Sequence, residues 1–104
     1  MKVIKRDGRT IEFDREKIEV AIEKANKEVR GKQKATKEET NEIIAYIEDL
    51  GKKRMLVEDI QDIIEEKLME FDKYELAKKY IVYRYTRALV RKSNTKKNLK
   101  KKWK

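Results

Sequence analysis

Four basic side chains near the start of the chain have the type and spacing of an anion-binding site. Lys5, Arg6 and Arg9 crowd a turn between two short runs of alternating apolar and polar residues. Lys17 falls in the first turn of the helix predicted to follow. Because a helix N-terminus offers unpaired N–H groups and a partial positive charge, cations beside it favour phosphate groups. Ordinary solvated charge on a surface hairpin explains the same four residues equally well.

The elements that must position these cations are a hairpin and the helix after it. The runs Lys2–Arg6 and Arg9–Phe13 are joined by Asp7-Gly8. Asp-Gly between two such runs predicts a β-hairpin with a type I′ turn, in which both central residues need φ > 0. Asp14 then stands where a helix N-cap is expected. We therefore expect the hairpin to run directly into the N-terminus of a helix.

Apolar residues recur at helical spacing along most of the chain. They predict four helices, over about Arg15–Val29, from the capping box Thr36–Glu39 to Gly51, from about Glu58 to Phe71, and from the N-cap Asp72 to about Arg91. The run Lys53–Val57 is too short for a helix and predicts a third strand, because a lone hairpin is marginal in water. The predicted fold is α+β, a small three-stranded sheet (the N-terminal hairpin plus one further strand) packed on a four-helix bundle.

One charged residue interrupts the apolar face of the last predicted helix. That face is lined by Leu76, Ala77, Tyr80, Ile81 and Ala88. Arg84 falls on the same face, and Arg87 follows three residues later. A guanidinium on an apolar stripe must reach solvent, pair with an acid or meet an anion. A structural salt bridge, an edge position and an anion site are all open at this point.

Composition excludes several function classes and separates a body from a tail. The chain has 104 residues, enough for one domain, and contains neither Cys nor His. Thiol nucleophiles, imidazole bases, disulfides and most transition-metal sites are therefore excluded, and we expect no enzyme activity. The sequence also lacks a signal peptide and an apolar run of membrane length, which predicts a cytoplasmic protein without membrane association.

The net charge of +9 is concentrated at the C-terminal end. Arg91–Lys104 holds eight Lys or Arg and no acid, so the rest of the chain has 21 basic against 20 acidic residues. We predict a folded domain over residues 1–92 and a Lys-rich, disordered tail over residues 93–104, which contains Trp103. The tail has two interpretations, a solubilising end or a salt-sensitive nucleic-acid binder that gives the protein an alternative function.

Three stretches resemble the ATP-cone domain, a regulatory nucleotide-binding module found at the N-terminus of many ribonucleotide reductases and in the repressor of reductase genes. They are VIKRDGRTIEFDREKI at Val3–Ile18, VEDIQDIIEEKL at Val57–Leu68 and YELAKKYIVYRYTRAL at Tyr74–Leu89. The resemblance implies the same small sheet on four helices. It also implies ATP or dATP as allosteric effectors that are not hydrolysed, and we expect Mg²⁺ to enter with their phosphates. The partner it implies is a reductase catalytic subunit or a second copy of the chain.

Carried over to this sequence, the resemblance assigns ten residues to the nucleotide. Those expected at the phosphates are Lys5, Arg6 and Lys17, those bordering base and sugar are Val3, Phe13 and Ile18, and those presented by the last helix are Arg84 and Arg87. Two positions depart from the family pattern. Val57 stands where some members have a threonine hydroxyl near the phosphates, and Gln61 where some aerobic reductases have histidine. Because reductase cysteines and a zinc ribbon are both missing, we expect a stand-alone cone or a fragment of a larger protein.

Overall fold

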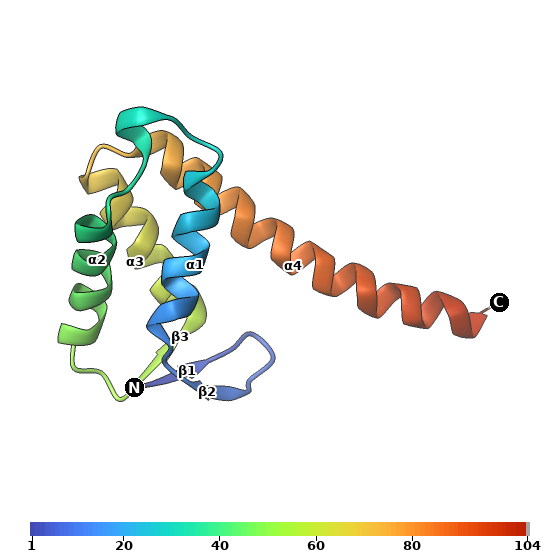
Figure 1. The fold of residues 1–104 in the computed structure, drawn as a ribbon. Helices are drawn as coiled ribbons and strands as arrows, with labels where there is room; N and C mark the ends of the chain where they lie inside the picture. The colour runs from blue at the N-terminus through green and yellow to red at the C-terminus, as the bar shows by residue number, and fades with distance from the viewer. Residues whose placement is uncertain (104) are drawn as a thin grey trace.

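A three-stranded sheet lies at one end of a bundle of four helices in the computed structural model (Figure 1). The structure describes residues 1–103, and the side chains of residues 1–89. In chain order the elements are β1 (Lys2–Ile4), β2 (Thr10–Glu12), α1 (Arg15–Asn26), the 3₁₀ turn η1 (Gly31–Gln33), α2 (Lys37–Asp49), β3 (Arg54–Leu56), α3 (Val57–Glu70) and α4 (Tyr74–Trp103). The predicted α+β architecture is confirmed.

The sheet has the strand order β2-β1-β3, so the first strand is central. β1 pairs antiparallel with β2, where Val3 faces Ile11, and parallel with β3, where Val3 faces Met55. The predicted hairpin and third strand are both confirmed. Because Val3 and Met55 are buried, the sheet closes one end of the hydrophobic core.

The hairpin turn differs from the type I′ turn that Asp7-Gly8 predicts. The Gly8 N–H donates to the carbonyl of Lys5 at 2.9 Å, and the Lys5 N–H donates to the carbonyl of Arg9 at 2.8 Å. Gly8 has φ +88°, whereas Asp7 has no positive φ. These are the features of a three-residue loop, in which a left-handed glycine follows an ordinary turn. The Asp7 carboxylate supports this loop by accepting from the Arg9 backbone N–H at 3.0 Å.

Two of the three predicted helix caps are confirmed. The Asp14 side chain accepts from the Glu16 N–H at 3.0 Å and begins α1. Thr36 and Glu39 form a reciprocal capping box at the start of α2, with N···O distances of 3.1 and 2.9 Å. Each cap satisfies backbone N–H groups that have no partner within the helix.

The prediction that Asp72 caps the N-terminus of α4 is wrong. Asp72 has φ +61° and ends α3 instead of beginning α4. Its N–H donates to the carbonyl of Met69 and the N–H of Lys73 donates to that of Leu68, both at 2.9 Å, which is a Schellman motif. The N-terminus of α4 is satisfied from elsewhere, because the Glu75 N–H donates to the side-chain oxygen of Gln33 in η1 at 3.0 Å.

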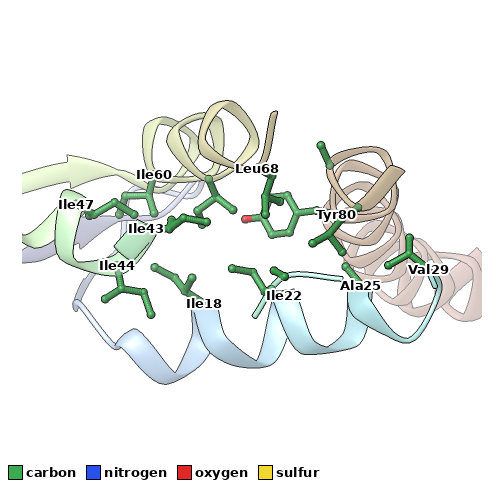
Figure 2. Close-up of a cluster of buried hydrophobic side chains, with 14 of the residues drawn as sticks. Ile18, Ile22, Ala25, Val29, Ile43, Ile44, Ile47, Ile60, Leu68 and Tyr80 are labelled. Atoms are coloured by element: carbon green, nitrogen blue, oxygen red, sulfur yellow. The ribbon is translucent and has the colours of Figure 1, made fainter. Parts of the chain in front are cut away.

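The core lies where the apolar faces of the four helices meet. Figure 2 shows side chains of α1, α2, α3 and α4 converging on one interior. The fully buried large residues are Ile22, Ile43, Ile44, Ile47, Ile64, Leu68 and Leu76. Ile81, predicted on the apolar face of α4, is 38% exposed and lies outside this core.

α4 continues as a helix to Trp103, beyond the predicted end near Arg91, and extends away from the bundle (Figure 1). The sequence after Gly51 contains no Gly or Pro that would stop it. The division into a domain over 1–92 and a disordered tail over 93–104 stays a prediction, and the side chain of Trp103 lies outside the described residues. Within the described part of the chain, no helix is long and apolar enough to cross a membrane.

Candidate functional site

A cavity of about 640 Å³ lies between the hairpin, α1, α3 and α4. The residues predicted from sequence to form a site all line it: Val3, Lys5, Arg6, Phe13, Lys17, Ile18, Val57, Gln61, Arg84 and Arg87. They come from three segments far apart in the chain. The fold therefore brings together the three stretches that carried the family resemblance.

The cavity has apolar walls at depth and basic side chains toward solvent. Val3 and Ile18 are buried, and Phe13 and Val57 are half-buried. The basic lining residues are Lys5, Arg6, Lys17, Lys24, Arg84 and Arg87, of which Arg6, Lys17, Lys24 and Arg87 are exposed. Such a site suits a ligand with one flat apolar part and one anionic part. Three acidic residues, Glu12, Asp14 and Glu16, also line the cavity and partly offset these cations.

The N-terminus of α1 borders the cavity. Asp14, Glu16 and Lys17 from its cap and first turn are all lining residues. Lys5 and Arg6 of the hairpin turn line the same cavity. The basic turn and the helix N-terminus therefore lie beside each other, as the sequence predicts. Lys17 and Arg87 make no ion pair with any side chain that the structure describes, so both can meet an anion directly.

Arg84 is paired with two carboxylates of α3. Its Nη1 donates to Glu65 Oε1 in a short contact and lies 3.4 Å from Asp62 Oδ1. The Arg84 and Glu65 side chains are 18% and 16% exposed, whereas Asp62 is 60% exposed. Burial alone would lower the pKa of Arg84, but hydrogen bonds and charge from Glu65 and Asp62 raise it above its ordinary value. Of the three interpretations left open by the sequence, a salt bridge is present, on a residue that also lines the cavity.

Arg6, in the hairpin turn, is also paired with a carboxylate of α3. Its Nε lies 3.1 Å from Oε1 of Glu58, in the first turn of α3. Both side chains are about half exposed, at 52% and 49%, so this pair contributes little to folding stability. Arg6 can therefore exchange its partner at small cost.

Sequence reasoning missed two residues that join α1 to α4 at the cavity. The Lys24 Nζ lies 5.9 Å from the centroid of the Tyr83 ring, and both residues line the cavity. A signal was available, because Lys24 follows Lys17 by two helical turns and Tyr83 directly precedes Arg84. Tyr80, predicted only as a core residue, also lines the cavity, and burial raises the pKa of its phenol.

Gln61 presents an unsatisfied polar atom at the site. Its side-chain oxygen is buried and has no hydrogen-bond partner among the described residues. A buried carbonyl oxygen without a donor is unfavourable, so a ligand hydroxyl or amino group would satisfy it. The described residues contain no group of three or more carboxylate, His or Cys ligands that could hold a metal ion.

In sequence, residues 1–89 match the family model of the ATP cone domain. This range includes every residue that lines the cavity. The chain belongs to the ATP-cone domain family. ATP cones are regulatory rather than catalytic domains, so the chain is a regulatory, nucleotide-sensing module.

Relatives of this ATP cone are reductase chains. The alpha subunit of ribonucleoside-diphosphate reductase from Chlamydia pneumoniae is 38% identical over 98 residues, which cover 86% of this chain and 9% of that protein. The vitamin B12-dependent ribonucleoside-diphosphate reductase of Thermoplasma acidophilum is 38% identical over 96 residues, or 86% and 12%. This ATP cone thus spans about a tenth of the length of the curated relatives it matches.

Proposed function

We propose that this ATP cone binds ATP and dATP in the cavity without hydrolysing them and acts as an allosteric sensor. The observation that carries the proposal is the composition of the cavity lining, which combines apolar side chains, six basic side chains and a helix N-terminus. An adenine ring can pack on the apolar part while the triphosphate meets the basic part. The regulatory class of the family supports binding without hydrolysis.

The charges available are sufficient for useful affinity. A triphosphate carries about four negative charges at neutral pH. Each hydrogen bond between charged groups contributes on the order of 1.5–3 kcal/mol, and micromolar binding requires only about −8 kcal/mol in total. Three to five such contacts and a partly buried base would supply this after the cost of ordering the ligand.

In the proposed arrangement the hairpin and the start of α1 hold the phosphates through Lys5, Arg6 and Lys17. Base and sugar pack against the lining residues Val3, Phe13 and Ile18, and the oxygen of Gln61 accepts a hydrogen bond from the nucleoside. Arg84 and Arg87 reach the phosphates from α4. Mg²⁺ would enter with the phosphates, because no cluster of protein ligands is present in the described residues to hold it alone.

As an allosteric module, the cone would use the bound nucleotide to bias association with a reductase catalytic subunit or with a second copy. Such coupling requires two states that differ in nucleotide affinity. α4 contributes residues to the cavity lining and extends away from the bundle (Figure 1). A change in the position of α4 on nucleotide binding would therefore change a surface that a partner can contact.

Calorimetry with ATP, dATP and GTP tests the proposal, because it gives affinity, stoichiometry and base selectivity together. We expect both adenine nucleotides to bind and GTP to bind more weakly. Lys17→Ala should weaken ATP binding, whereas Lys78→Ala, which removes an exposed lysine of α4 outside the cavity, should leave it unchanged. Equal loss in both variants would contradict the site, and absence of ATP binding to the wild-type chain would contradict the function. Light scattering of the same samples reports any change in association.

A further inference from the structure

Three carboxylates on one face of α3 hold two of the arginines at the cavity. Glu58, Asp62 and Glu65 are spaced by four and three residues, which places them along a single side of the helix. Glu58 pairs with Arg6, and Asp62 and Glu65 pair with Arg84. None of the three acids lines the cavity. They therefore contact the two arginines without belonging to the cavity lining.

These acids complete a balance of charge at the site. Six basic and three acidic side chains line the cavity, so the lining alone carries an excess of positive charge. The three α3 carboxylates add as many negative charges as that excess. Before it can bind Arg6 and Arg84, an incoming polyphosphate therefore meets guanidinium groups that are already paired with protein carboxylates, whereas Lys17 and Arg87 pair with no carboxylate that the structure describes.

We propose that the α3 carboxylates compete with the nucleotide phosphates for Arg6 and Arg84, and that Glu65 in particular lowers the affinity of the site for ATP. This inference rests on the proposed function, since it concerns the same cavity and ligand. It makes Glu65 an affinity-setting residue that does not touch the ligand. Its effect is to weaken the attraction of Arg84 for every phosphate compound that enters the cavity.

Among the three carboxylates, Glu65 has the largest effect on ATP affinity, because its ion pair with Arg84 is the least exposed to solvent. The Glu65 side chain is 16% exposed, against 60% for Asp62 and 49% for Glu58. Charge interactions are stronger where water is excluded. Both acids contact Nη1 of Arg84, which leaves Nε and Nη2 without a partner among the described side chains. A phosphate can approach this remaining edge, but it meets a guanidinium whose charge two carboxylates already offset.

The test is Glu65→Gln, compared with wild type by calorimetry and by thermal melting. We expect ATP to bind on the order of tenfold more tightly, because one negative charge near the phosphates is removed. We also expect the ligand-free protein to melt at a lower temperature, because Arg84 loses its best partner. Opposite shifts of affinity and stability are the signature of competition, since a side chain with only a structural role would lower both.

Glu66→Gln is the matched control, because Glu66 is the adjacent residue of α3, is exposed, and pairs with no side chain that the structure describes. It changes the net charge equally and should leave ATP affinity unchanged. Equal tightening in Glu66→Gln would overturn the proposal in favour of overall charge, and weaker ATP binding in a folded Glu65→Gln would overturn it in favour of a positioning role. If wild type binds ATP and Glu65→Gln binds it equally, only this inference fails. If wild type does not bind ATP, the proposed function itself fails.

Discussion

Replacing Arg84 by leucine should separate the two roles of this side chain, as partner of α3 and as part of the cavity wall. In the ligand-free protein the change leaves Glu65, at 16% exposure, with a carboxylate that has lost its partner. Breaking a fully buried ion pair costs about 3–5 kcal/mol, and an exposed pair contributes about 0–1 kcal/mol. Because this pair is partly exposed, we expect Arg84→Leu to lower the free energy of unfolding by about 2 kcal/mol. For a domain of this size that lowers Tm by roughly 10 °C.

The double variant Arg84→Leu, Glu65→Leu tells this cost apart from a general packing defect. Replacing both partners of a shielded ion pair by apolar residues is often neutral or stabilising, so the double variant should recover most of the lost stability. The three proteins should rank differently in ATP affinity than in stability. The single variant should bind at least about tenfold more weakly than wild type, because it loses a charged hydrogen bond. The double variant should fall between the two, because it also loses the opposing carboxylate.

Urea melts of the ligand-free proteins and ATP calorimetry of the same preparations measure both quantities. A single variant as stable as wild type would show that the pair with Glu65 contributes nothing to folding. A single variant that binds ATP as wild type does would remove Arg84 from the site and leave Arg87 as the basic contribution of α4. Failure of the double variant to recover stability would mean that the aliphatic stem of Arg84, not its charge, is what the fold requires.

Three further changes test other parts of the account. Gly8→Ala should cost about 1 kcal/mol in urea melts, because φ is +88° there, and Gly8→Asn should cost less; equal stability of all three proteins would contradict the turn geometry. Because burial raises the pKa of Tyr80, the folded state resists its ionisation, so stability should fall as pH rises above about 10. Tyr80→Phe should reduce that fall in melts at high pH, whereas Tyr85→Phe, at an exposed position, should not. Deleting residues 93–104 should leave ATP affinity unchanged in calorimetry, and a loss would place the tail in the site.

Elements that depend on neighbours in the sequence were predictable. The hairpin, the Asp14 cap and the capping box at Thr36 all depend on residues within a few positions of one another. Where the local signal has two solutions, prediction failed. Asp-Gly suits a two-residue or a three-residue loop, and Asp72 suits an N-cap or a left-handed helix end. The neighbouring sequence does not decide between the two solutions in either case.

The cavity could be predicted only in part, for a related reason. Its basic residues were visible as cations at a predicted helix N-terminus and on an apolar face, and the family resemblance joined them into one site. The partners of those cations were not visible. The pair between Arg84 and Glu65 and the approach of Lys24 to Tyr83 each depend on how α4 crosses α3 and α1, which short-range periodicity does not specify.

The central claim is that ATP occupies the cavity between the hairpin, α1, α3 and α4. An NMR titration of the ¹⁵N-labelled chain with ATP tests this most directly, because each backbone amide reports separately on nearby binding. We predict saturable shifts concentrated in residues 3–18, 57–61 and 80–88, with residues 42–46 of α2 unaffected as an internal control. Shifts centred instead on a second, smaller cavity, which is lined by Glu42, Tyr46, Lys67, Glu70 and Phe71, would contradict the account, as would the absence of any saturable shift.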